Sequence, residues 1–187
     1  TSFGSAREKA LIDKEKKENP NRTVIALDAG DAFQGLPASN QSKGQDMAKA
    51  MNEIGYKAMA AGNHEFDFGL DTVEKYKNNT QNGGWLNFPI LSTNVYKDGK
   101  RLFEPSTIIN ENGVKIGIVG VTTPETATKT NPTGIKGVTF KKPIPEVTNE
   151  ITRIKDKVDF IAVLAHLGDD TTTLEDEKGS KRRFPSL

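Results

Sequence analysis

The stretch KAMAAGNHEFDFG, residues 57–69, decides the fold of this 187-residue chain. Its first five residues predict a short strand, and the polar loop 62–69 follows that strand at once. Asp71 then offers an N-cap for a helix, with Glu74 three residues on as its capping-box partner. This unit of strand, loop and helix recurs along the chain, which predicts an α/β fold with a largely parallel sheet.

Apolar strands and amphipathic helices lie on both sides of this stretch. The sequence predicts further strands at residues 23–27, 88–92, 114–121 and 158–165, and helices at residues 4–18, 44–55 and 143–157. Between these elements, the turn signals Asp98-Gly99 and Glu111-Asn112-Gly113 predict β-hairpins within residues 95–113.

The composition excludes several classes of function. Lys and Arg number 26 against 25 Asp and Glu, so the formal net charge of +1 gives no reason to expect nucleic acid or an anionic membrane as partner. We find no apolar stretch long enough to span a bilayer and no signal-peptide pattern at the start. The chain has no cysteine, which rules out disulfides, cysteine metal ligands and a cysteine nucleophile.

Four polar residues each follow the end of a predicted strand, namely Asp31, Asn63, Asn94 and His166. Because ligands of α/β sheets bind beyond the carboxyl ends of the strands, these residues are candidates for one shared site. Each also has a purely structural interpretation, since Asp often caps turns and a lone His often serves as a hydrogen-bonded structural residue.

The candidate residues have the chemistry of a metal site with a catalytic histidine. A carboxylate such as Asp31 can bridge two cations, and the mixed oxygen and nitrogen donors suit Zn, Mn, Fe or Co better than Ca. His64 can face a substrate while Asp67, three residues later, orients its ring and raises its basicity. Such a His–Asp pair beside a metal is suited to protonating or stabilising a leaving oxygen.

The motifs DAGDAFQG (28–35), GNHEFDFG (62–69), LSTN (91–94), GIVGVTTPE (117–125) and AHLG (165–168) together resemble the 5′-nucleotidase branch of the calcineurin-like metallophosphoesterases. The resemblance covers about residues 1–170. Within that branch it is greatest to secreted and cell-wall-anchored enzymes of Gram-positive bacteria, which implies an extracellular or cell-wall-associated bacterial protein. It also implies a sandwich of mostly parallel sheets flanked by helices.

The resemblance implies hydrolysis of nucleoside 5′-phosphates such as AMP by a water activated by two divalent metal ions, Zn, Mn or similar. Asp31 matches the bridging carboxylate, and Asn63 and His166 match ligands of one metal. His64 and Asp67 match the catalytic pair, with His64 stabilising charge on the transferring phosphoryl group. Asn94 is assigned a supporting or substrate-binding role.

Two departures from the family pattern concern the ends of the chain. The family's Asp-x-His strand and Gly-His-x-His segment, which supply further metal ligands, have no counterpart here, and neither does its substrate domain. We therefore expect residues 1–168 to form a catalytic core that is incomplete at both ends. Residues 169–187 are expected to be a polar, poorly ordered tail, and the chain by itself is expected to hold one metal ion or none.

Other functions remain open at this point. The same metal core serves 2′,3′-cyclic-nucleotide phosphodiesterases and UDP-sugar hydrolases, and the domain that would distinguish them is missing from the chain. A chain with three candidate ligands, Asp31, Asn63 and His166, could also be an inactive fragment. A surface-binding domain on this fold is a further alternative, although it would leave GNHEFDFG unexplained.

Overall fold

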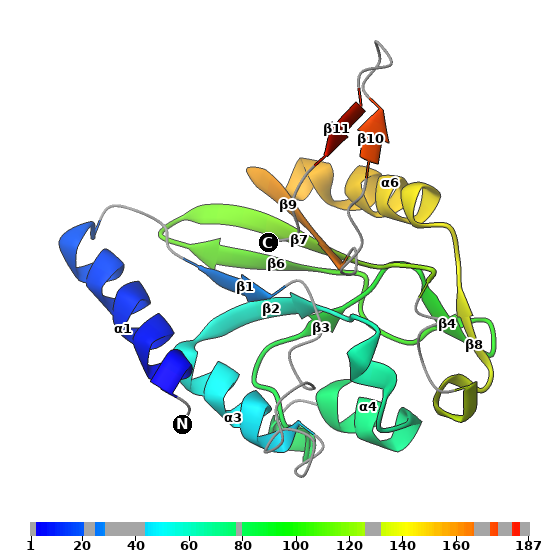
Figure 1. Cartoon of the computed structure of the whole chain (residues 1–187). Coiled ribbons are helices and arrows are strands. Elements are labelled where there is room, and N and C mark those ends of the chain that lie inside the picture. Colours follow the sequence, from blue (N-terminus) through cyan, green and yellow to red (C-terminus); the bar gives the residue numbers. More distant parts are fainter. Residues whose placement is uncertain are drawn as a thin grey trace.

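The computed structural model describes residues 3–20, 25–28, 44–77, 80–125, 132–166, 173–175 and 181–183. The candidate ligand Asp31 lies outside these residues. Two sheets lie face to face between helices, with α3 and α4 on one side and α6 on the other (Figure 1). This arrangement confirms the α/β class and the helix-flanked sandwich expected from the resemblance.

The first sheet is parallel and carries the loop that opened the sequence analysis. It has the order β1-β2-β3, formed by Ala26–Asp28, Tyr56–Ala60 and Ile90–Leu91. The helices α3 (Gln45–Ile54) and α4 (Leu70–Lys77) precede and follow β2. Since the strands run the same way, the residues after Ala60 and after Leu91 emerge at the same edge of the sheet.

The second sheet is mixed, with the order β6-β7-β9. β6 (Ser106–Glu111) and β7 (Val114–Thr122) pair antiparallel, whereas β9 (Phe160–His166) runs parallel to β7. The helix α6 (Pro143–Ile154) and the 3₁₀ turn η4 (Lys155–Lys157) lead into β9. The register pairs Thr122 with His166, so the last residues of the two strands lie side by side.

Antiparallel pairing is confined to hairpins and to two small sheets. β4 (Val95–Lys97) pairs with β5 (Lys100–Arg101) and with β8 (Val138–Phe140). The predicted turns are confirmed, because Asp98 and Gly99 have φ of 50° and 80°, and Asn112 and Gly113 have φ of 53° and 79°. Two successive left-handed residues make a type I′ turn, which matches the twist of a hairpin.

Two apolar clusters hold the layers together. Between the two sheets pack Ala58, Leu91 and Ile118, each with 0% of its surface exposed. Under the helices α3 and α4 lies a larger cluster that includes the buried side chains of Met51, Phe66, Val73 and Tyr76. Both clusters surround β2 and β3, which fixes the loops that leave the carboxyl ends of these strands.

The helix α6 buries less of its apolar face than its spacing predicts. Ile154 is 1% exposed and packs over Gly117, where an added Cβ would meet its Cδ1 atom at 2.8 Å. At the other end of the helix, Ile144 is 78% exposed. Phe160 at the start of β9 is also 65% exposed. The helix therefore anchors on β7 mainly through its last turn.

Two expectations need correction or addition. The N-cap is not Asp71: α4 begins at Leu70, and Val73 donates its backbone N–H to the carbonyl of Gly69. Gly69 has φ of 88°, which turns the chain into the helix two residues earlier than an Asp71 cap would. The sequence analysis assigned no strand to residues 169–187, where β10 (Thr173–Glu175) pairs antiparallel with β11 (Lys181–Arg183).

The remaining elements agree with the sequence or are short turns. The predicted first helix is α1 (Phe3–Glu18), whose described side chains are largely exposed. The 3₁₀ turns are η1 (His64–Phe66), η2 (Thr80–Asn82) and η3 (Pro132–Ile135). In the described part of the chain, no helix combines the length and apolarity needed to cross a membrane.

Candidate functional site

The loop after β2 is a compact turn that is held by hydrogen bonds among its own residues. The N–H of Gly62 donates to the carboxylate of Glu65 at 2.9 Å, and Glu65 is completely buried. The turn η1 follows, with backbone hydrogen bonds from Phe66 to Asn63 and from Asp67 to His64. Because a 3₁₀ turn brings residues three apart onto one side, it sets His64 beside Asp67.

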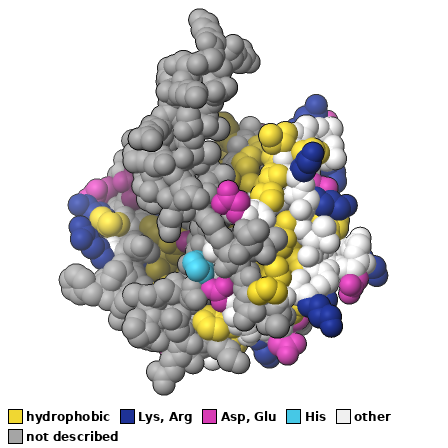
Figure 2. Space-filling model, turned by 45° about the vertical axis from the view of Figure 1, so that its right-hand side comes forward, with side chains coloured by type: hydrophobic (Ala, Val, Ile, Leu, Met, Phe, Trp, Pro, Cys, Tyr) yellow, Lys and Arg dark blue, Asp and Glu magenta, His cyan; other side chains and the backbone are white. Residues whose placement is uncertain are grey.

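His64 and Asp67 form a close pair. The Nδ1 atom of His64 lies 2.6 Å from Oδ2 of Asp67. The side chain of His64 is 40% exposed and that of Asp67 is 17% exposed. In Figure 2 a histidine side chain reaches the surface next to an acidic one. The carboxylate fixes the orientation of the imidazole ring, as the sequence predicted, and leaves the pair within reach of a ligand.

Buried aromatic side chains hold this turn in place. Phe66 is 0% exposed and packs edge-on against Phe103 and Phe140, with ring centroids 5.9 and 5.8 Å apart. Burial raises the pKa of Tyr76 well above its usual range, and the negative charges of Glu65 and Asp67 raise it further. Tyr76 therefore stays protonated behind the His64–Asp67 pair at any physiological pH.

Asn63 lies at the head of η1, directly before His64. It is a polar residue with only 6% of its surface exposed. An amide in such a position has been taken out of bulk water, and its carbonyl oxygen is a competent metal ligand. The structure thus brings the sequence-predicted residues Asn63, His64 and Asp67 together on one turn.

Asn94 is an internal connector. It is 0% exposed, and its Oδ1 accepts hydrogen bonds from the backbone N–H of Thr122 at 2.9 Å and from the hydroxyl of Ser92 at 3.1 Å. Its Nδ2 donates to the carbonyls of Thr122 and Lys141 at 2.6 and 3.0 Å. These contacts tie β3 to β7 and favour the supporting role over substrate binding.

His166 and Asp31 are less completely defined. His166 is the last residue of β9, in register with Thr122, so its backbone lies at the same edge of the sandwich as the end of β7. Its side chain and all of Asp31 fall outside the described residues. Among the described side chains, no three of His, Asp and Glu gather as a metal site would require.

Sequence reasoning missed two residues of this region, Ser92 and Thr122. Both are 0% exposed, and their hydroxyl oxygens lie 2.8 Å apart between β3 and β7. Thr122 directly follows the predicted strand 114–121, and the four residues that were singled out also come after predicted strands. That position was a signal, but a hydroxyl was given less weight than a carboxylate or an imidazole.

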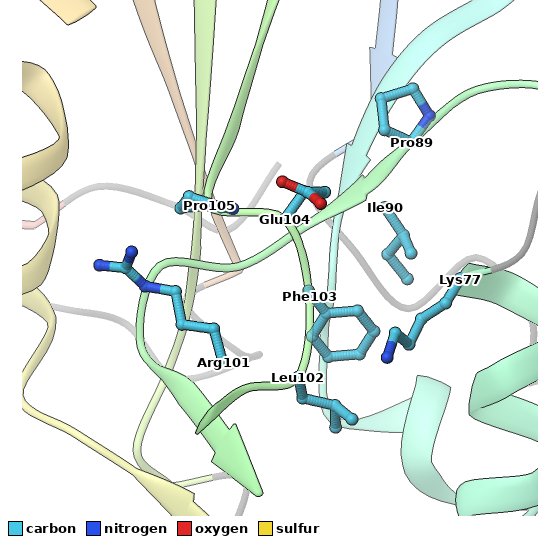
Figure 3. Close-up of a pocket in the computed structure, with 8 residues that line it drawn as sticks. All are labelled: Lys77, Pro89, Ile90, Arg101, Leu102, Phe103, Glu104 and Pro105. Carbon is cyan, nitrogen blue, oxygen red and sulfur yellow. The ribbon is translucent and has the colours of Figure 1, made fainter. Parts of the chain in front are cut away.

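One described pocket shares Phe103 with the packing around this turn. It has a volume of about 320 Å³ and lies beside the start of β3, at the opposite end of that strand from Asn94 (Figure 3). Its walls are formed by Lys77, Pro89, Ile90, Arg101, Leu102, Phe103, Glu104 and Pro105. The guanidinium of Arg101 points away from Lys77 and pairs with Glu146 at 3.2 Å, which leaves the pocket without a converging pair of cations.

Residues 19–181 match the family described as bacterial capsule synthesis protein PGA_cap. The chain belongs to this family. The matched region runs from the residue after α1 to the first residue of β11. It contains the turn with His64 and the ends of β3, β7 and β9, so the PGA_cap match covers the whole candidate site.

Curated relatives of this PGA_cap chain include the 5′-nucleotidase of Vibrio cholerae, 40% identical over 172 residues. Protein UshA of Salmonella pullorum is 36% identical over the same length. Each alignment covers 89% of this chain and 30% of the relative. The chain therefore spans less than a third of the length of the relatives that it matches.

Solved structures with the same fold point to the same group of proteins. The 5′-nucleotidase precursor of Thermus thermophilus gives a TM-score of 0.71 at 33% identity, over 88% of this chain and 32% of that one. The calcineurin-like phosphoesterase YfkN of Bacillus subtilis gives a TM-score of 0.73 at 27% identity, over 94% of this chain and 56% of that one. The NAD nucleotidase of Haemophilus influenzae gives a TM-score of 0.66 at 27% identity, over 86% of this chain and 32% of that one.

These similarities confirm the resemblance to 5′-nucleotidases and the calcineurin-like phosphoesterase fold of this PGA_cap chain. The narrower expectation of a Gram-positive affinity stays a prediction. The division at residue 168 and the roles of the site residues stay predictions as well.

Proposed function

We propose that the protein to which this chain belongs hydrolyses nucleoside 5′-phosphates, such as AMP, to nucleoside and phosphate. The observation that carries the proposal is the 2.6 Å contact between His64 and Asp67 on a turn held by buried aromatic rings. The 5′-nucleotidase relatives support the substrate class. As the chain spans 30% of their length, the activity is proposed for the longer protein.

His64 would act on the transferring phosphoryl group. Asp67 fixes the ring through Nδ1. In its imidazolium form, His64 would also donate a hydrogen bond from Nε2 to a phosphate oxygen or to the leaving 5′-oxygen as negative charge develops there. A partly exposed pair can meet a substrate while the buried Phe66 keeps the turn from moving. Stabilising charge that exists only in the transition state raises the rate of the chemical step.

The residues present fit a site for divalent cations, Zn, Mn or similar. Asn63 is an almost buried amide at the edge where β2, β3, β7 and β9 end, and His166 stands at the end of β9. Together with Asp31 they would supply two oxygen donors and one nitrogen donor, a set suited to such ions. Two such ions, when bound, hold the phosphate and lower the pKa of a water molecule.

Recognition of the base would depend on residues outside the chain. Phe66 on the His64 turn is fully buried and offers no free face for stacking. We propose that the longer protein supplies a second, substrate-binding domain, and that the chain contributes the phosphate end of the site. We also propose an extracellular bacterial location, which fractionation of the native host would test.

A second candidate is hydrolysis of larger nucleotides, including UDP-sugars and 2′,3′-cyclic nucleotides. The structural similarity to a NAD nucleotidase favours this candidate, because NAD joins two nucleotides through a pyrophosphate. The same turn could serve either reaction, since both break a phosphorus–oxygen bond.

The decisive experiment is a substrate panel on the full-length protein with AMP, UDP-glucose, NAD and 2′,3′-cyclic AMP. The proposal expects kcat/KM to be largest for AMP. If AMP is inert while another member of the panel turns over, the second candidate replaces the first. His64→Ala in the same preparation distinguishes the enzyme's own turnover from that of a contaminant.

The 187-residue chain by itself is proposed to be inactive and to bind one metal ion or none. Its three candidate ligands are fewer than a two-metal centre requires. Elemental analysis after dialysis tests this point, and two tightly held metal ions per chain would contradict it. A purely adhesive domain remains a weaker candidate, because it would leave the His64–Asp67 contact without a use.

A further inference from the structure

Thr122 occupies the point where four strands of the two sheets end together, namely β2, β3, β7 and β9. It is the last residue of β7 and is 0% exposed. Its hydroxyl donates to the carbonyl of Ala61, directly after β2, at 2.7 Å, and lies 2.8 Å from the hydroxyl of Ser92, directly after β3. Its backbone is paired with His166 of β9.

The protons in this cluster can be assigned from the number of donors. Ser92 and Thr122 have one hydroxyl proton each, whereas the carbonyl of Ala61 and the Oδ1 of Asn94 can only accept. Thr122 donates its proton to the carbonyl of Ala61 at 2.7 Å, so the single proton of Ser92 faces two acceptors, the hydroxyl oxygen of Thr122 at 2.8 Å and Oδ1 of Asn94 at 3.1 Å. The shorter of these two contacts continues the chain from Ser92 through Thr122 to Ala61.

This chain of hydrogen bonds ends beside the candidate site. Ala61 is held on its other side as well, because its N–H donates to the carbonyl of Leu91 at 3.0 Å. The next residue, Gly62, is fixed by Glu65, and Asn63 follows immediately. A shift of the Ala61 carbonyl would therefore move the turn with Asn63 and His64 relative to the end of β9.

We propose that Thr122 is a positioning residue, whose buried hydroxyl sets the distance between the Asn63–His64 turn and His166 and thereby the geometry in which divalent cations bind. The inference rests on the proposed function for its catalytic consequence, but its consequence for metal affinity can be measured separately. It assigns a role to a residue that neither binds the metal nor touches the substrate.

The chain offers a matched control in Thr93. Its hydroxyl is also 0% exposed and donates to a backbone carbonyl, that of Gly120, at 2.9 Å. It links β3 to β7 as Thr122 does, but its hydroxyl bonds to Gly120 rather than to Ala61. Thr93→Val and Thr122→Val thus each remove one buried hydroxyl and keep the shape of the side chain.

The experiment compares Thr122→Val, Thr122→Ser and Thr93→Val in the full-length protein. Calorimetric titration of the metal-free protein with Mn²⁺ gives the affinity, and thermal unfolding without metal gives Tm. Both valine variants are expected to lower Tm by similar amounts. Only Thr122→Val is expected to weaken Mn²⁺ binding, by about 10–100-fold, and Thr122→Ser should recover most of that loss.

Kinetics on AMP add a second readout. Thr122→Val is expected to lower kcat with little change in KM, because the substrate's own contacts remain. A Thr122→Val protein that binds Mn²⁺ as Thr93→Val does would overturn the proposal. If Thr122→Val does not fold, Thr122→Cys replaces it, since a thiol is a weak donor; wild-type Mn²⁺ affinity in that variant would also overturn the proposal.

Failure of the proposed function would look different. A wild-type protein that hydrolyses none of the nucleotides in the panel would contradict the proposed function alone. The Mn²⁺ titration would still decide the role of Thr122, because it needs no substrate.

Discussion

Gly120 of β7 passes so close to Leu91 of β3 that a Cβ atom on Gly120 would lie 2.4 Å from the carbonyl oxygen of Leu91. At the same place the N–H of Thr93 donates to the carbonyl of Gly120 at 2.8 Å. The two sheets are therefore in backbone contact two residues before Thr122. No side chain fits between them at this position.

The first prediction concerns this contact. Gly120→Ala should lower the free energy of unfolding by about 1–3 kcal/mol, because the obstructing atoms belong to the backbone of Leu91 and cannot rotate away. Gly117→Ala is the matched control on the same strand, where the nearest atom is the flexible Cδ1 of Ile154 at 2.8 Å. Urea unfolding measures both variants, and an equal loss in the two would contradict this interpretation.

The second prediction concerns the proposed catalytic pair, His64 and Asp67, in the full-length protein. His64→Ala should lower kcat on AMP by about 10²–10⁴-fold, the usual contribution of a positioned acid–base group. The content of bound metal should stay near that of the wild type, which elemental analysis checks. Turnover that survives the substitution would remove His64 from the mechanism.

Asp67→Asn completes a double-mutant cycle with His64→Ala. If Asp67 acts only by orienting the imidazole, Asp67→Asn should by itself lower kcat on AMP about 10–100-fold. In a protein that already carries His64→Ala, Asp67→Asn should not lower kcat any further, because the two residues act as a unit. Additive losses would mean that Asp67 has a role of its own.

The third prediction distinguishes the two roles that the sequence left open for Asn94. Asn94→Ala leaves the buried N–H of Thr122 without its acceptor, so the free energy of unfolding should fall by roughly 1–3 kcal/mol. Asn110→Ala, on the exposed face of β6, should have little effect. A raised KM at unchanged stability would instead identify Asn94 as a substrate ligand.

The fourth prediction concerns the buried carboxylate of Glu150. Burial raises its pKa, but hydrogen bonds from Arg153 and Ser106 outweigh that effect and hold the pKa below its usual value. A group whose pKa is lower in the folded state stabilises the fold above the unfolded pKa of about 4.3. That stability is lost as the pH falls through the folded pKa.

The free energy of unfolding should accordingly decrease as the pH falls below about 4.3. Glu150→Gln should be less stable than the wild type at neutral pH. Its free energy of unfolding should fall less than that of the wild type when the pH is lowered. Glu53→Gln, on the exposed side of α3, controls for the removal of one negative charge. Denaturant titrations from neutral to acidic pH measure all three proteins, and parallel curves for wild type and Glu150→Gln would contradict the assignment.

Much of the fold follows from the sequence because its causes are local. The hairpin turns at Asp98-Gly99 and Asn112-Gly113 were predictable, since few residues other than Gly, Asn and Asp accept two successive left-handed conformations. The pairing of His64 with Asp67 was predictable for the same reason. Residues three apart in a 3₁₀ turn lie on the same side of the turn, so the two side chains are placed next to each other.

The tertiary structure decided what the local sequence left open. Asp71 had the properties of a helix cap, yet the left-handed Gly69 starts α4 earlier. The largely parallel sheet of the sequence analysis became two sheets, one parallel and one mixed, in contact at Gly120 and Leu91. The pairing of β10 with β11 had no signal in the polar composition of the tail.

The sequence by itself determined the turn, the residues proposed to act on a phosphate and the edge of the sheet at which they were expected. Only the tertiary structure joined Ser92 and Ala61 to Thr122, from which they lie 30 and 61 positions away along the chain. Local propensities act over a few residues. The hydrogen-bond partner of a buried hydroxyl, in contrast, depends on which polar group the tertiary packing places within about 3 Å of it. The site's residues are thus encoded locally, and their mutual positions are set by the contact between the two sheets.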